Sequence, residues 1–313
     1  MKTFFYTSIT IIAGLLLSSY VFQTQTEKQD KKLLSDFRYK NLPASEVLQK
    51  INNINFADED GMSFLIIASA KGNKVMCEML IDKGAMLDWQ AKDGMNAMVA
   101  AAMQQHPVVV KLLLEKGAKP DLRWDGITAL MVATEAGQAE IVKLLLAHGA
   151  DPDLLWEGTT ALMIASQEGK TEVARLLLEA GAQTDLQDNF GWTALTIAAQ
   201  FGRVEITKLL VEKGAKIDLQ ANDGITTLMI ASKEGKTEIV KILLDKGSQV
   251  NIQDTYGLTA LAFASQMGRT EIVKLLLGKG ADPDLKSNEV KTAYDYAVNR
   301  DIKALLAAHS NEN

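Results

Sequence analysis

Apolar residues recur along most of the chain in short blocks with helical spacing, and glycine closes each block. The stretch from Thr128 to Ala150, TALMVATEAGQAEIVKLLLAHGA, shows the unit clearly. Thr128 is placed to cap a first helix through its hydroxyl, and Gly137 is placed to end that helix with a left-handed backbone. A second apolar helix then runs to Gly149. The pattern predicts two short helices joined by a turn, and neither helix buries its apolar face alone.

Near-copies of this unit follow one another at an almost constant period. The first glycines stand 33, 32, 32, 33, 33 and 33 residues apart, at Gly61, Gly94, Gly126, Gly158, Gly191, Gly224 and Gly257. The glycines that close the second helices are Gly84, Gly117, Gly149, Gly181, Gly214, Gly247 and Gly280. We therefore predict stacked repeats, because stacking supplies the buried surface that one unit lacks.

The period and the motif after each first glycine resemble the ankyrin repeat family. Successive copies of the motif read SFLIIA, NAMVAA, TALMVA, TALMIA, TALTIA, TTLMIA and TALAFA. The resemblance covers about Pro43 to His309. It implies an all-α ankyrin repeat solenoid of helix-turn-helix units joined by β-turn loops, here with an N-terminal hydrophobic segment. With that segment, the chain resembles a bacterial-type exported or membrane-anchored ankyrin repeat protein.

Two departures from the family pattern change the local expectations. The family usually has Thr-Pro-Leu-His where this chain has Thr-Ala-Leu-Met, so Met131, Met163 and Met229 imply an apolar contact in place of a hydrogen bond. The second repeat has QQHP at 104–107 and no glycine between its helices. We expect a local bend or shift there, with the second helix beginning at Pro107.

The N-terminal segment has two open interpretations. Residues 4–22 carry no charge and follow Lys2. The segment is nearly as long as the roughly 20 apolar residues that an uncleaved membrane anchor needs. A cleaved secretory signal is the alternative, although Leu17 and Ser19 make a poor cleavage site. We expect export, either membrane-anchored or periplasmic/secreted, while the basic residues between 28 and 38 keep a cytoplasmic-facing anchor open.

The predicted organisation has five parts. These are residues 1–22, a signal peptide or membrane anchor; 23–42, a polar linker with a weak helix at 31–40; 43–60, an N-terminal partial repeat; 61–289, seven ankyrin repeats; and 290–313, a C-terminal capping repeat and tail.

Composition and charge narrow the class of partner. The net charge is −6 and the pI is near 5.3, and no basic stripe is present, which argues against nucleic acid. Cys77 is the only cysteine among 313 residues, so an internal disulfide is impossible. We expect a monomer that binds a protein partner, uses no cofactor or metal, and contacts a membrane only through residues 4–22 if these are uncleaved.

The repeated residues form the scaffold. We therefore expect the binding site at positions whose residues differ between copies. In ankyrin repeats these positions flank the first glycine and precede the inter-helix glycine, on the concave face. The resemblance assigns the partner-binding role to Trp124, Trp156, Phe190, Trp192, Phe201, Ile225, Tyr256, Leu258 and Met267. Exposed aromatic residues are typical of protein interfaces, which favours this interpretation.

A purely structural interpretation of the tryptophans stays open beside it. Trp124 and Trp156 lie in the two units that are one residue short, so their indoles could stack on each other and fill a gap. For the binding interpretation, we expect one row of aromatic residues along the turn tips, with Trp192 and Phe201 beside it. The row consists of Trp124, Trp156, Phe190 and Tyr256. Trp89 stands at a leucine position and is expected to be buried between turns.

No constellation of residues predicts catalysis. His106, His148 and His309 are far apart in a linear array, and Cys77 lies beside Met76 in an apolar helix. Aspartates recur at one repeat position, which is better explained by turn hydrogen bonding than by acid/base work. The recurring residues are Asp121, Asp153, Asp185 and Asp218. We therefore predict a non-catalytic interaction module, with a secreted binding protein or effector as the alternative and an enzyme or small-ligand receptor as a weaker one.

Overall fold

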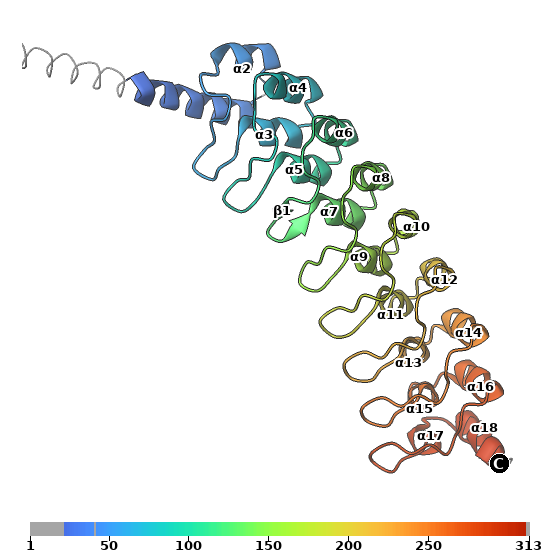
Figure 1. Cartoon of the computed structure of the whole chain (residues 1–313). Helices are drawn as coiled ribbons and strands as arrows, with labels where there is room; N and C mark the ends of the chain where they lie inside the picture. Colours follow the sequence, from blue (N-terminus) through green and yellow to red (C-terminus); the bar gives the residue numbers. More distant parts are fainter. Residues whose placement is uncertain (1–21, 41, 311–313) are drawn as a thin grey trace, which may run out of the picture. The chain divides into compact units, whose positions relative to one another are not determined.

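The computed structural model describes residues 22–40 and 42–310, and its secondary structure is almost entirely helical (Figure 1). The chain divides into two compact units. One contains residues up to 133 together with 147–150, and the other contains 134–146 and the residues from 151 onward. Helices α7 (Ala129–Glu135) and α8 (Ala139–Ala147) contribute residues to both.

The first unit begins with a helix over residues 22–39, followed by short helix pairs. Its elements are α2 (Ala44–Lys50), α3 (Phe64–Ala70), α4 (Lys74–Asp82), α5 (Ala97–Met103), α6 (Pro107–Glu115), β1 (Arg123–Trp124) and β2 (Ile127–Thr128). Helix α3 packs on α5, and α4 packs on α6. First helices therefore form one layer and second helices another (Figure 1).

The second unit repeats the same two-layer packing. Its helices are α9 (Ala161–Glu168), α10 (Thr171–Glu179), α11 (Ala194–Gln200), α12 (Val204–Glu212), α13 (Thr227–Lys233), α14 (Thr237–Asp245), α15 (Ala260–Gln266), α16 (Thr270–Gly278), α17 (Ala293–Tyr296) and α18 (Arg300–Ser310). Odd-numbered helices pack in succession from α9 to α17, and even-numbered helices from α10 to α18. The buried core is therefore continuous between neighbouring repeats of this unit.

In the seven full repeats, each first helix begins at a capping side chain, as the motif predicts. The Met131 amide donates to the Thr128 hydroxyl at 3.3 Å, which confirms the predicted cap. Equivalent bonds cap α3, α5, α9, α11, α13 and α15, through Ser63, Asn96, Thr160, Thr193, Thr226 and Thr259. Such a cap satisfies one backbone N–H that the first helical turn would otherwise leave unpaired.

The motif methionines keep a weak polar contact. The Thr160 amide donates to Met163 Sδ at 3.5 Å, and the Thr226 amide donates to Met229 Sδ at 3.4 Å. These contacts lie within one repeat, so the expected apolar contact between neighbouring repeats stays a prediction. Thioether sulfur is a weak acceptor, so it buries apolar surface and still engages the capping amide.

The second repeat keeps the regular geometry without its glycine. Gln105 adopts φ 58°, close to the φ of 66° at Gly72 in the first repeat, and α6 begins at Pro107 as predicted. Helices α5 and α6 have 7 and 9 residues, the same lengths as α3 and α4. The expected bend or shift is absent from these helices, because Gln105 accepts the left-handed backbone.

Residues 22–39 are helical throughout, where the sequence predicts a polar linker followed by a weak helix. Leu33, Leu34 and Phe37 are buried, so the apolar residues of the predicted linker belong to the core. Asp30 is also buried, and its carboxylate accepts the backbone amides of Asn52 and Asn53 at 2.9 Å each. The segment docks as a helix because both its apolar face and its buried carboxylate find partners.

The prediction of an anchor or signal at residues 1–22 lies outside the described residues, apart from Phe22. Across residues 22–40 and 42–310, the helices lack the combination of length and apolar character needed to cross a membrane.

At the C-terminus, Val290 takes the place that glycine has in the preceding turns. Its φ is 62°, a conformation that a β-branched residue adopts only under strain. Its side chain is exposed, so substitution removes little packing. We expect Val290→Gly to raise the free energy of unfolding of this repeat by about 1 kcal/mol. Hydrogen exchange of α17 and α18 measures this. Val298→Gly, also at an exposed valine, is the control and is not expected to stabilise.

Candidate partner-binding site

The turn before α11 is a tight hairpin that fixes two aromatic residues. The Asp188 amide donates to the Trp192 carbonyl, and the Gly191 amide donates to the Asp188 carbonyl, both at 2.9 Å. Gly191 has φ 82°, and a Cβ there would lie 2.6 Å from the Asn222 backbone nitrogen, so only glycine fits. Asp188 Oδ1 accepts the amides of Phe190 at 2.9 Å and Trp192 at 2.8 Å. The carboxylate therefore holds the backbone of both aromatic residues.

The two shorter turns have a different geometry. Trp156 and Thr159 exchange backbone hydrogen bonds of 3.0 and 2.8 Å around Glu157 at φ 49° and Gly158 at φ 84°. In the first unit, Trp124 pairs with Ile127 in the β1–β2 ladder. Positive φ at both central residues defines the two-residue type I′ hairpin.

The predicted row of aromatic residues along the turn tips is therefore wrong for the two tryptophans. Trp156 lies at the base of its hairpin, the position that Asp188 has in the longer turn, whereas Phe190 lies at a tip. Trp124 has the same basal position in its own turn. The short turns have one residue fewer between the basal residue and the glycine. Counting back from the glycine therefore does not reach equivalent positions in short and long turns.

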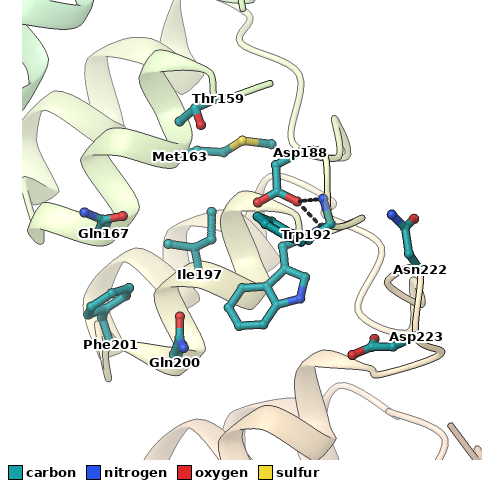
Figure 2. A pocket seen from close by; sticks show the side chains of 11 residues that line it. Thr159, Met163, Gln167, Asp188, Trp192, Ile197, Gln200, Phe201, Asn222 and Asp223 are labelled. Atoms are coloured by element: carbon teal, nitrogen blue, oxygen red, sulfur yellow. Dashed lines mark hydrogen bonds between the residues drawn. The ribbon is translucent and has the colours of Figure 1, made fainter. Parts of the chain in front are cut away.

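The second unit has a hollow of about 540 Å³ that collects three of the predicted residues (Figure 2). Its lining consists of Thr159, Met163, Gln167, Asp188, Phe190, Trp192, Ile197, Gln200, Phe201, Asn222 and Asp223. In Figure 2 the Trp192 indole lies in the middle, with Gln200 and Phe201 on one side and Asn222 and Asp223 on the other. Three consecutive repeats thus contribute to one concave site.

The floor of the hollow is buried, but its aromatic walls are exposed. Met163 is 1% exposed and Ile197 8% exposed, whereas Phe190 is 73% and Phe201 45% exposed. Trp192 is half-buried, and its indole N–H has no hydrogen-bond partner in the described part of the chain. A partner can therefore cover a large apolar area here and also accept a hydrogen bond.

Hydrogen bonds between neighbouring turns hold the rim in place. The Asn222 amide donates to the Phe190 carbonyl at 3.0 Å, and the Asn222 side chain donates to the Asn189 carbonyl at 2.9 Å. Asn189 in turn donates from its side chain to the Glu157 carbonyl at 2.8 Å. Because the backbone under the aromatic side chains is tied on both sides, binding requires little ordering of the site.

The other predicted residues lie outside this hollow. Tyr256 and Met267 are 67% and 41% exposed, whereas Ile225 and Leu258 are half-buried. Trp156 is half-buried and is not part of the lining. The structure thus groups Phe190, Trp192 and Phe201 and leaves the remaining six as separate positions.

Trp124 and Trp89 have structural hydrogen bonds within the first unit. The Trp124 indole donates to Asp93 Oδ2 at 2.9 Å. The Met95 amide and, to a smaller extent, this indole hold the pKa of Asp93 below its ordinary value. Trp89 donates to the Gly61 carbonyl at 2.8 Å and is partly buried, somewhat less than predicted.

Sequence reasoning missed Met163, Ile197 and Asp188 as part of the site. Met163 and Ile197 look like core residues by period, and they are buried, but their outer surfaces form the floor. Asp188 stands three residues before Gly191, which is a signal for a carboxylate that organises a turn.

Three of the recurring aspartates and two of the histidines have structural hydrogen-bond partners. The recurring aspartates accept hydrogen bonds from the next repeat: Asp153 from the Gln183 amide, Asp185 from the Lys216 amide and Asp218 from the Gln249 amide. This confirms turn hydrogen bonding for these three. His106 contacts the Ala70 carbonyl at 3.1 Å, and His309 contacts the Leu305 carbonyl at 2.8 Å. Within residues 22–40 and 42–310, metal-binding groups of three or more suitable side chains are absent.

Cys77 is a core thiol. It is fully buried with Ser69 Oγ 3.6 Å from its sulfur, and burial raises its pKa to about 11. At pH 8 about one thiol in a thousand is then ionised, and thiol reagents attack the thiolate. We expect Ellman's reagent to modify native protein at least about a hundredfold more slowly than urea-unfolded protein. Equal rates would contradict this burial.

Comparison with known families agrees with this architecture. The family model described as "Ankyrin repeats (3 copies)" matches five overlapping segments, residues 37–124, 87–155, 130–221, 180–254 and 215–287. No curated protein matches the chain significantly. Ankyrin repeats are protein–protein interaction modules, and the matched segments together span residues 37–287, most of the chain. The protein therefore belongs to the ankyrin repeat family, with its scaffold defined by the repeated caps and helices described above.

Proposed function

We propose that the chain is a non-catalytic interaction module that binds a protein or peptide segment on its ankyrin groove, with the hollow around Trp192 as the anchoring site. The observation that carries this proposal is the combination of exposed Phe190 and Phe201 with half-buried Trp192 around one concavity. Aromatic residues of this kind provide much of the binding free energy at protein interfaces, because covering them desolvates a large area at a small entropy cost.

A peptide selection tests the proposal. The purified full chain is used to select binders from a displayed random peptide library, and the affinities of the recovered peptides are then measured for wild type and for Trp192→Ser. We expect a recurring peptide motif and at least tenfold weaker binding by the variant. Trp89→Ser, whose indole lies in the first unit, is the matched tryptophan control. Peptides that bind wild type and Trp192→Ser equally would refute the anchoring site.

The cellular location is part of the proposal. The uncharged residues 4–22 support a module exported and held at a membrane, and release as a secreted binding protein or effector after cleavage is the alternative. Cell fractionation and sequencing of the mature N-terminus separate the two. A chain that begins near Gln23 excludes the anchor, whereas an intact N-terminus in the membrane fraction excludes cleavage.

A further inference from the structure

The hollow around Trp192 is acidic as well as aromatic. Asp188 and Asp223 line it beside the three aromatic residues, and its lining includes no lysine or arginine. A cation is attracted both to carboxylates and to the faces of aromatic rings, most strongly to tryptophan. The charge and the apolar surface therefore favour the same type of ligand group.

Each carboxylate has one oxygen in a turn and one oxygen left over. Asp188 Oδ1 accepts two backbone amides, and Asp223 Oδ1 accepts the Ile225 amide at 3.1 Å. The second oxygen of each has no partner in the described part of the chain. Two acceptors thus remain for a ligand, on side chains whose positions the turns fix.

The nearby arginine does not neutralise these carboxylates. Arg203 follows Phe201 closely, but its Nε and Nη2 donate to the Gln167 carbonyl at 3.1 and 2.9 Å. Its guanidinium is therefore bound at the last turn of α9. The negative charge of Asp188 and Asp223 stays available to a partner.

Resting on the function proposed above, we propose that the hollow binds an arginine side chain of the partner peptide. The planar guanidinium stacks on the Trp192 indole, and the negative charges of Asp188 and Asp223 attract it. Arginine fits better than lysine because its guanidinium is flat, weakly hydrated and able to donate several hydrogen bonds in one plane. The unpaired indole N–H of Trp192 is then available to a peptide carbonyl.

The test uses peptides selected on the full chain and a charge-removing double variant. Asp188→Asn/Asp223→Asn keeps an amide oxygen as the acceptor for the turn amides and removes both charges. We expect an arginine in the selected motif, with about tenfold weaker binding when citrulline replaces it or when the double variant replaces wild type. The loss should diminish at 1 M salt, which screens the attraction.

Asp254→Asn is the matched control, since Asp254 Oδ1 accepts the amides of Tyr256 and Leu258 in a turn outside the hollow. We expect it to leave the affinity unchanged. If circular dichroism shows that the double variant is unfolded, Asp223→Asn alone decides the question, because its side chain accepts a single turn amide.

The outcomes separate the two proposals. A Trp192-dependent motif without arginine, or equal binding of the arginine and citrulline peptides, overturns the arginine assignment and leaves the anchoring site standing. Failure to find any Trp192-dependent peptide overturns both.

Discussion

Replacing Phe37 with alanine should lower the stability of the first repeats by about 3 kcal/mol. Phe37 is only 2% exposed, and its ring centroid lies 6.2 Å from that of Phe64 on α3. The Lys71 ammonium lies 5.6 Å from the same ring. Truncating a buried phenylalanine removes about 3 to 5 kcal/mol, because it loses burial and leaves a cavity. A polar linker, as predicted from the sequence, would show no such effect.

Hydrogen exchange of α3 and α4 measures this loss, because repeat arrays need not unfold as a single cooperative unit. Tyr39→Ala is the control from the same helix. Tyr39 is 76% exposed, so its removal should change the stability by less than about 0.5 kcal/mol. Equal effects of the two substitutions would show that residues 22–39 do not dock on the repeats.

Trp192→Ala should weaken binding of a selected peptide about thirtyfold, equivalent to about 2 kcal/mol. The indole lies centrally in the hollow and is already half-buried, so a partner can desolvate it fully (Figure 2). Phe190→Ala should weaken binding less, about fivefold, because Phe190 is at the rim and 73% exposed. Isothermal calorimetry with wild type and each variant measures these differences.

Tyr256→Ala is the matched control for the rim. Tyr256 has the same turn-tip position as Phe190 two repeats later and is 67% exposed, but it lies outside the hollow. We expect less than about a threefold change. If Tyr256→Ala weakened peptide binding as much as Trp192→Ala, the binding free energy would be spread along the turn tips, as the sequence pattern suggested. It would then not be concentrated in the hollow.

The scaffold was predictable because its signals are local and repeated. Thr128 caps its helix and Gly137 ends it with φ 73°, as the single stretch around them indicates. The ankyrin assignment from the 33-residue period is confirmed by the family match. Each cap and each helix end depends on residues a few positions apart, so one copy of the repeat suffices to predict it. The further copies show the same residues at the same positions.

The site was only partly predictable because it is assembled from three repeats. Phe190, Trp192 and Phe201 were identified as variable residues, but the sequence does not show that Met163 and Ile197 expose a surface between them. The helix over residues 22–39 was predicted only in part, as a weak helix at 31–40, for a similar reason. Its polar residues outnumber its apolar ones, and its burial depends on partners such as Asn52 and Phe64 that lie far along the chain.

The two short turns differ from the longer turns in the size of the side chain at their base. The basal residues of the longer turns are Asp58, Ala91, Asp188, Ala221, Asp254 and Ser287, all smaller than tryptophan. In the two-residue hairpins the basal residues are Trp124 and Trp156, both half-buried. One residue inserted between Trp156 and Gly158 would restore the length of the longer turns, and the indole would then have to pack where the other repeats have a smaller side chain.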